Sequence, residues 1–174
     1  QVTGVQTCAL PICFDELVVK SLDEITFLRE NGLGDIPLVS DANLYVLNHL
    51  AREQMEDLGI SRMTLPLELN SRELETLGCE EMELYVYGYL PAMVSAQCIV
   101  RTTKGCTKQP EVLKMKDRTG KDLPVKNHCR FCYNTIYNPS PLSLLGQEKL
   151  IRRLAPGALR LAFTLETPEQ MKAV

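Results

Sequence analysis

The chain has 174 residues, 45% of them hydrophobic, and a formal net charge of −3. That length and apolar content are sufficient for a domain with a real core. No run of eighteen apolar residues and no secretion signal are visible, so we expect no membrane span and a cytoplasmic location. The seven cysteines are odd in number and clustered, which favours metal or redox chemistry over a disulfide framework.

Residues 1–13, QVTGVQTCALPIC, do not match the pattern of the chain that follows. They carry no charge and no clear hydrophobic period. We interpret them as a non-native segment that resembles a translated sequencing adapter; a native strand and turn is the other interpretation. In the first case Cys8 and Cys13 carry no function.

The first strand–helix unit begins after Phe14. The apolar run at 17–19 is typical of a buried strand. Ser21 then precedes a stretch with helical spacing, and Glu24 follows three positions later, which is the pattern of a capping box. Asn31 and Gly32 are expected to end this helix.

Two further units follow with short connections. Residues 36–39 predict a strand, and Asp41 or Asn43 is expected to cap a longer helix that ends at Gly59. The apolar positions that favour this helix are Leu44, Leu47, Leu50, Ala51, Met55 and Leu58. A third strand is expected to begin at Met63 and run on to Leu69.

A short helix is predicted next, capped by Asn70 or Ser71 and ended by Gly78. Residues 82–87 predict a fourth strand. Much later in the chain, residues 159–165 predict another strand, and Thr167-Pro168-Glu169 opens a helix with proline at its first position.

This alternation of strands and helices predicts an α/β fold with a parallel sheet. A unit recurs about every 20–25 residues, which is typical of a TIM-type (β/α) barrel. Five units cannot close eight strands, so we interpret the chain as a fragment, with the rest of the barrel outside it. The predicted parts are βα units at 14–100, a cysteine-rich basic insertion after the fourth strand at 101–158, and a further truncated unit at 159–174.

The insertion is the basic part of an acidic chain. Residues 1–100 carry five Lys and Arg against sixteen Asp and Glu, whereas residues 101–130 carry nine against three. The turn at 117–122 separates two extended runs and predicts a hairpin. The basic run is either a solvated surface or an electrostatic footprint for an anionic partner, such as RNA or a small carboxylate.

Four cysteines lie in or next to the insertion: Cys98, Cys106, Cys129 and Cys132. Four converging thiolates can hold zinc or an iron–sulfur cluster. A standard zinc ribbon has two close pairs, whereas this spacing suits ligands from separate loops. We therefore predict one metal site, with Cys79 a buried thiol outside it. His128 is either a further ligand or an exposed loop histidine, and the exposed histidine is the interpretation we favour.

The sequence around the fourth strand carries a motif: Glu83-Leu84-Tyr85-Val86-Tyr87-Gly88, followed by Gln97-Cys98. It resembles the signature of the peptidase U-32, or collagenase-like, family, and LPLELNSREL upstream and CYNTIYNPSPLSLL downstream resemble that family as well. Pro91 stands where the first family cysteine belongs, Ala96 where a glycine is usual, and Arg101 where a serine is usual.

The resemblance implies an enzyme that holds an iron–sulfur cluster through four cysteines. With Pro91 in the first position, a complete set requires Cys129 or Cys132 as a replacement. The family is named for peptidase activity, and some members are linked to hydroxylation of RNA bases or quinone precursors. A zinc-bound module without catalytic activity is the alternative to an enzyme.

Three further residues are candidates for catalysis or substrate binding: Glu68, Asp41 and Asn70. Each is expected near the C-terminal end of a strand, where barrel active sites lie. Glu68 is the strongest, because a carboxylate within an apolar run costs free energy unless it is paired; a structural hydrogen bond is its alternative role. Asp41 and Asn70 also suit helix caps. The sequence contains no HExxH motif and no serine in a nucleophile elbow.

Overall fold

The structure is a computed structural model that describes residues 14–106 and 108–174. The chain divides into two compact units. Unit 1 holds the chain as far as Leu84 together with Arg152–Ala158, and unit 2 holds Tyr85–Ile151 and Leu159–Val174. The chain passes between the units within β4 (Glu83–Gly88), α5 (Glu148–Leu154) and β10 (Ala158–Ala162). The adapter-like segment at 1–13 lies outside the described residues.

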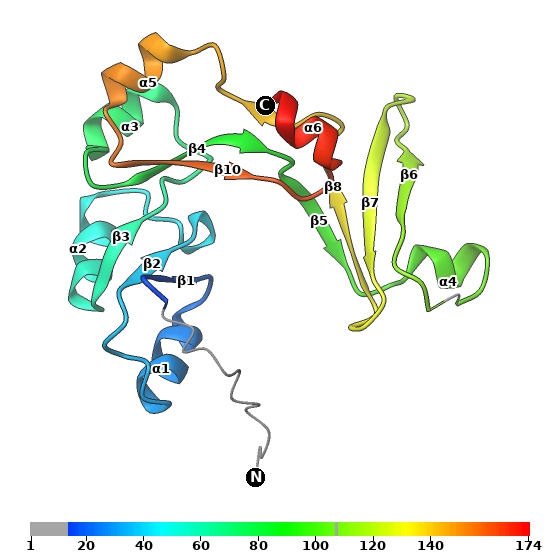
Figure 1. The fold of residues 1–174 in the computed structure, drawn as a ribbon, viewed down its shortest axis with the longest axis horizontal. Coiled ribbons are helices and arrows are strands. Elements are labelled where there is room, and N and C mark those ends of the chain that lie inside the picture. The colour runs from blue at the N-terminus through cyan, green and yellow to red at the C-terminus, as the bar shows by residue number, and fades with distance from the viewer. Residues whose placement is uncertain (1–13, 107) are drawn as a thin grey trace. The chain divides into compact units, whose positions relative to one another are not determined.

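Unit 1 contains a parallel sheet in the order β1-β2-β3, visible in blue and cyan in Figure 1. Its strands are β1 (Leu17–Val19), β2 (Leu38–Ser40) and β3 (Ile60–Met63). Both pairings are parallel, and beyond β3 Thr64 forms a parallel bridge with Glu83 at the start of β4. Parallel strands need crossover connections, and the helices between these strands supply them. The parallel direction predicted from the sequence is confirmed.

The predicted caps explain two of the helices of unit 1. In α1 (Leu22–Glu30) the Glu24 backbone N–H donates to Ser21 Oγ at 3.4 Å, but the Glu24 carboxylate accepts from Lys20 N instead of Ser21 N. Only half of the predicted capping box therefore forms. In α3 (Ser71–Leu77) both halves form, between Asn70 and Glu73.

The long helix predicted from Asp41 or Asn43 to Gly59 is wrong. The chain forms a short 3₁₀ helix, η1 (Ala42–Leu44), and then a separate helix, α2 (His49–Asp57). Tyr45 between them has φ 51°, a left-handed conformation that no α-helix can include. The Asn48 side chain accepts from Ala51 N at 2.9 Å and starts the helix there.

The core of unit 1 forms between the sheet and these helices. Its most deeply buried apolar side chains come from strands, helices and loops in turn, namely Val19, Ile25, Val39, Val46, Leu65, Leu77 and Met82. Leu50, by contrast, is 76% exposed although it fitted the helical pattern. The β2 strand is buried at all three positions, as expected of a strand inside a parallel sheet.

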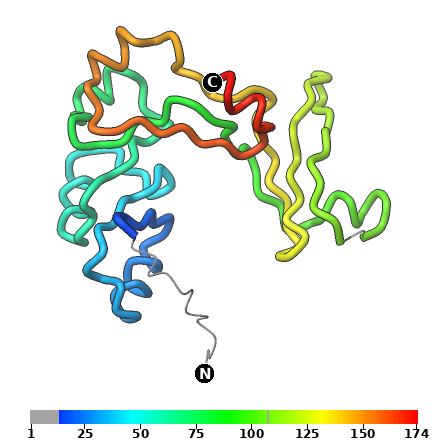
Figure 2. The backbone as a smooth tube through the Cα atoms, viewed as in Figure 1, coloured from blue at the N-terminus to red at the C-terminus, as the bar shows by residue number. Residues whose placement is uncertain are grey.

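Unit 2 contains an antiparallel sheet in the order β5-β8-β7-β6. Its strands are β5 (Pro91–Ser95), β6 (Val112–Lys116), β7 (Asp122–His128) and β8 (Tyr133–Tyr137), and Figure 2 shows the chain running back and forth along them. The short helix α4 (Ile99–Thr103) follows β5. Val125 and Ile136, cross-strand partners on β7 and β8, are buried in this sheet.

The predicted basic hairpin is the pair β6–β7. Its turn is closed by Asp117, whose carboxylate accepts from Thr119 N at 2.7 Å and from Lys121 N at 2.9 Å. The hydrogen bond from Lys121 N, with those from Thr119, lowers the pKa of Asp117. The cations Lys114, Lys116, Arg118 and Lys121 are all exposed on this hairpin.

Three elements complete the described chain. The end of β4 pairs with β9 (Leu142–Ser143) in an antiparallel bridge. The helix α5 begins at Glu148. The C-terminal helix α6 (Pro168–Ala173) has the predicted start, because Thr167 and Gln170 form a capping box.

The fold is therefore mixed α/β, as predicted. The described strands form three sheets, and none of the three closes into a barrel. A partial (β/α) barrel stays a prediction for the parallel strands of unit 1. Within the described ranges, no helix has the length and apolar character needed to cross a lipid bilayer.

Candidate functional site

The four cysteines predicted as ligands line a single cavity in unit 2. Its volume is about 590 Å³. The lining consists of Ala96, Gln97, Cys98, Arg101, Thr102, Cys106, Asn127, His128, Cys129, Cys132 and Tyr133. Pro91, at the position of the first family cysteine, is the exposed first residue of β5 and is not part of this lining.

Two connections of the antiparallel sheet bring the cysteines together. Cys98 occupies the N-cap position of α4, and Cys106 follows the end of that helix. Cys129 and Cys132 lie in the turn between β7 and β8, where Phe131 N donates to His128 O at 3.0 Å. A CxxC within a tight turn projects its two thiols from a single loop, which suits a shared ligand.

The backbone at Cys132 is unusual. Its φ of 56° is left-handed, a conformation that costs a residue with a Cβ roughly 1–2 kcal/mol. The Cys132 Sγ lies 3.8 Å from the Cys129 carbonyl oxygen, within reach of a weak S–H hydrogen bond. Strained backbone tends to gather at functional sites, so the conformation supports a role for this turn beyond connecting two strands.

Cys129 is the cysteine most affected by its surroundings. Its thiol is half-buried and donates to Gln109 O at 3.1 Å. Burial raises the pKa of Cys129, and negative charge on Cys98, Cys106 and Cys132 raises it further. Thiolates that disfavour one another in this way are stabilised together when a cation binds between them.

His128 differs from the exposed loop histidine that we favoured. It is the half-buried last residue of β7 and lines the cysteine cavity. Its ring stacks on Tyr133 with centroids 4.3 Å apart and planes 16° from parallel. Its Nε2 lies 3.2 Å from Thr135 Oγ1, so the imidazole is fixed on two sides.

Sequence reasoning missed two buried asparagines, Asn127 and Asn134. Both lie inside strands, where asparagine is disfavoured, and both are at most 2% exposed. The signal that could have found them is this mismatch: polar amides at positions where the alternation of β7 and β8 calls for core side chains.

A second buried polar group in unit 2 was also missed. Glu166 is 9% exposed, and its Oε2 accepts from Thr164 N at 2.8 Å and from Leu165 N at 3.0 Å. Burial raises the pKa of Tyr87, and the Glu166 carboxylate nearby adds to that shift. Burial likewise raises the pKa of Tyr137.

The three other candidate residues lie in unit 1. The premise for Glu68 is wrong, because the strand ends at Met63 and Glu68 is exposed in a turn. Asp41 sits at the N-cap position of η1, although its side chain does not make the capping bond. Asn70 is engaged in the cap of α3, accepting from Arg72 N at 3.0 Å and Glu73 N at 3.2 Å. A catalytic role for any of the three stays a prediction.

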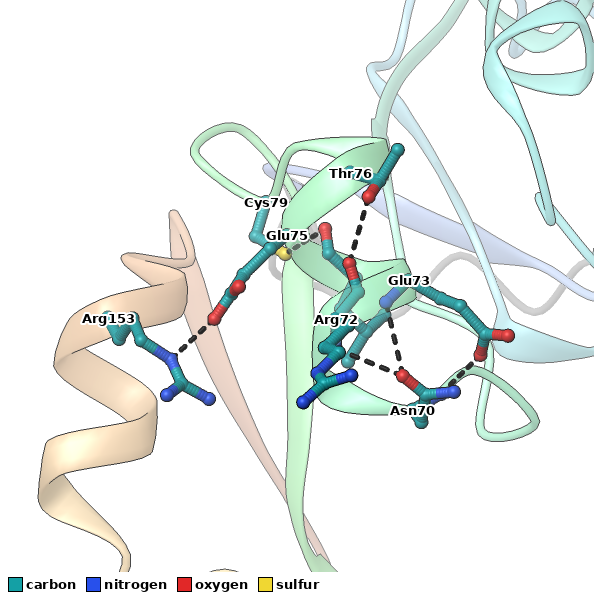
Figure 3. A network of polar contacts seen from close by, with 8 residues as sticks. Asn70, Arg72, Glu73, Glu75, Thr76, Cys79 and Arg153 are labelled. Carbon is teal, nitrogen blue, oxygen red and sulfur yellow. Dashed lines mark hydrogen bonds and ion pairs between the residues drawn. The ribbon is translucent and has the colours of Figure 1, made fainter.

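Figure 3 shows the polar contacts around α3. Asn70 and Glu73 cap its start, and Arg153 forms an ion pair with Glu75 on its side. Cys79, just beyond the helix, is 1% exposed and donates to Leu74 O at 3.2 Å. Burial raises the pKa of Cys79. The prediction of a buried thiol at the helix end is confirmed.

The cysteine cavity has donors suited to a metal, but they are not arranged as a closed ligand set. Among residues 14–106 and 108–174, no three His, Cys, Asp or Glu side chains are gathered tightly enough to hold a metal ion. The predicted metal site therefore stays a prediction, now with a cavity that its four cysteines share.

Comparison with known proteins gives one match. A family model described as Peptidase family U32 matches residues 11–154. No curated protein and no solved structure matches the chain.

Proposed function

Because the chain belongs to peptidase family U32, we propose that it binds an iron–sulfur cluster through Cys98, Cys106, Cys129 and Cys132. The single observation that carries this proposal is that the four cysteines line one cavity. The family motif at Glu83–Gly88 leads directly into this region of the chain. In this set, Cys129 or Cys132 takes the place of the family cysteine that is absent at Pro91.

The chemistry of the cavity suits such a cluster. Thiolates are the usual ligands of iron–sulfur clusters, and each thiolate binds a different iron atom of a four-iron cluster. A single zinc ion draws four sulfurs to about 2.3 Å from one centre. The four cysteines around one cavity supply the number of thiolates that either group needs, and the resemblance to the U-32 family favours the cluster. When bound, an iron–sulfur cluster supplies one-electron transfer.

Residues of the chain would tune that site without being ligands. Arg101 and His128 line the cavity, and cationic or hydrogen-bonding groups near thiolates stabilise their negative charge. The stacking of His128 on Tyr133 keeps the imidazole in place at the cavity wall.

The proposal predicts that serine at any of the four cysteines removes most of the bound iron. Serine keeps the size of the side chain but replaces the soft thiolate that iron prefers. The measurement is iron and acid-labile sulfide per chain after anaerobic reconstitution, together with visible absorbance. Cys79→Ser is the matched control, because its hydroxyl can still donate to Leu74 O outside the cavity; it should keep the iron content of the unaltered chain.

Two results would contradict the cluster. A colourless protein with one zinc per chain, lost on the same four substitutions, would establish the zinc-stabilised module instead. A chain that retains neither iron nor zinc would remove the metal site altogether.

We infer a second candidate function from the basic hairpin: modification of an anionic substrate, with RNA as the first choice. Four exposed cations lie along β6–β7, in the same unit as the cysteine cavity. Exposed cations attract phosphates and raise encounter rates. An anionic substrate fits the hydroxylation linked to some family members better than it fits peptide hydrolysis. A small carboxylate is the other anionic choice.

Replacing Lys114, Lys116, Arg118 and Lys121 together with alanine should weaken binding to single-stranded RNA. The slope of log affinity against log salt should fall by about 3, since each phosphate contact on a single strand contributes about 0.7. Filter binding across a salt series measures both quantities. Alanine at the exposed cations Lys149, Arg152 and Lys172 is the control. An equal effect from the control set, or no effect from the hairpin set, would show that the hairpin is only a solvated surface and does not bind RNA.

A further inference from the structure

Two buried asparagines face each other in the sheet that borders the cysteine cavity. Asn127 on β7 and Asn134 on β8 are register partners, on strands that lie side by side in Figure 1. They are 2% and 0% exposed. An amide removed from water to this extent is unfavourable unless its hydrogen bonds are made elsewhere, so the partners of each side chain show what it contributes.

Asn134 holds the segment that leads into Cys98. Its Nδ2 donates to the carbonyl oxygen of Gln97 at 2.7 Å, across a long separation in sequence. Gln97 lines the cavity and directly precedes Cys98. The Oδ1 of Asn134 is buried and has no hydrogen-bond partner among the described residues. Among the described residues, the hydrogen bond that this side-chain amide makes is therefore the bond to the Cys98 segment.

Asn127 holds the segment that follows Cys106. Its Oδ1 accepts from Glu111 N, its Nδ2 donates to Gln109 O at 3.4 Å, and its own backbone N–H donates to Glu111 O at 3.2 Å. The Gln109 carbonyl is also the acceptor for Cys129 Sγ. One side chain thus ties the 109–111 segment to the strand that ends beside Cys129.

We infer that Asn127 and Asn134 are the positioning residues of the cysteine cavity. Asn134 holds Gln97, directly before Cys98, and Asn127 holds the 109–111 segment, which follows Cys106, next to the turn that carries Cys129 and Cys132. The inference rests on the proposed function for the identity of the cofactor. The hydrogen bonds themselves do not depend on the cofactor, because they set the positions of the thiols in the metal-free chain.

The experiment uses Asn134→Leu in the full chain. Leucine has nearly the shape of asparagine but cannot donate to Gln97 O, and it removes the unpaired Oδ1. The reduced, metal-free protein is treated with dibromobimane, which bridges two neighbouring thiols, and the bridged peptides are identified by mass spectrometry. We expect the Cys98–Cys129 bridge to fall by about fivefold, the shift in population expected when one hydrogen bond is lost.

A positioning role and a merely structural role differ in the stability of the variant. Positioning predicts that the bridge is lost while the unfolding midpoint of Asn134→Leu stays the same or rises. The matched control is Asn48→Ala, which removes a comparable bond to Ala51 N in unit 1; it should lower the midpoint and leave the bridge unchanged. If the leucine variant does not fold, Asn127→Asp replaces it in the experiment. Aspartate keeps an acceptor for Glu111 N but loses the donor to Gln109 O. We expect this variant to form less of the Cys106–Cys129 bridge.

The outcomes separate the two proposals. Unchanged bridging in a folded Asn134→Leu chain, or equal loss in Asn48→Ala, would overturn the positioning role. If the unaltered chain binds no iron but the bridge responds as described, the iron–sulfur proposal fails and the positioning role stands. If both hold, reconstituted Asn134→Leu should also take up less iron and show lower visible absorbance than the unaltered chain.

Discussion

Replacing Gly88 with alanine is expected to destabilise unit 2 by about 4 kcal/mol, combining about 1–3 for backbone strain with about 1–3 for overpacking. Gly88 has φ 154°, and a Cβ there would lie 2.6 Å from the Ala162 carbonyl oxygen and 3.0 Å from the Tyr85 ring. The first contact is with backbone, which cannot rotate away. The Glu83–Gly88 motif therefore requires glycine at its last position, because β4 and β10 approach each other too closely there for a side chain.

Tyrosine fluorescence during denaturant unfolding measures this effect, because the chain has no tryptophan and five of its six tyrosines lie in unit 2. Gly146→Ala is the matched control. Gly146 has a φ of 86° but no atom within 4 Å of an added Cβ, so only the strain of about 1–2 kcal/mol should remain. Equal losses for the two variants would show that the close approach at Gly88 is not what requires glycine.

Replacing Leu65 with alanine is expected to destabilise unit 1 by about 3 kcal/mol, within the range of about 2–5 for buried leucines. Leu65 is 1% exposed, and its backbone N–H donates to Glu83 O at 2.8 Å, so the site cannot readily collapse around the smaller side chain. Far-ultraviolet circular dichroism follows this unit, since α1, α2 and α3 all belong to it.

The matched control for Leu65→Ala is Leu50→Ala. Leu50 is 76% exposed on α2, so its truncation should change stability by less than about 0.5 kcal/mol. The pair also tests the boundary of α2, because a continuous helix from Asp41 would have placed Leu50 in the core. A loss of several kcal/mol for Leu50→Ala would favour that longer helix.

The parts of the fold that the sequence predicted well are those set by local chemistry. Caps at Asn70 and Thr167 form as predicted because each bond joins residues three positions apart. The hairpin around Asp117 forms because its turn satisfies its own backbone. The interruption of the predicted helix at Tyr45 could not be read from periodicity, because the leucines on either side of it keep helical spacing. In the structure the buried side chain at this point is Val46.

The site was predicted in composition but not in detail. Cysteine chemistry and spacing indicated the four thiols that line the cavity. The supporting residues were missed because their role depends on contacts far apart in sequence, such as Asn134 with Gln97. The premise that Glu68 lies in a strand failed for the opposite reason: its apolar neighbours predicted a strand as far as Leu69, but β3 ends at Met63 and Glu68 is exposed in a turn.

The strand order β5-β8-β7-β6 has a consequence for how the protein folds. β6, β7 and β8 are joined by short connections and can pair rapidly, whereas β5 must close a loop across residues 96–132 before Ser95 meets Asn134. We therefore expect the turn with Cys129 and Cys132 to form early on the folding pathway, before Cys98 joins it. On this order of pairing, the CxxC turn would form while Cys98 is still separate from it.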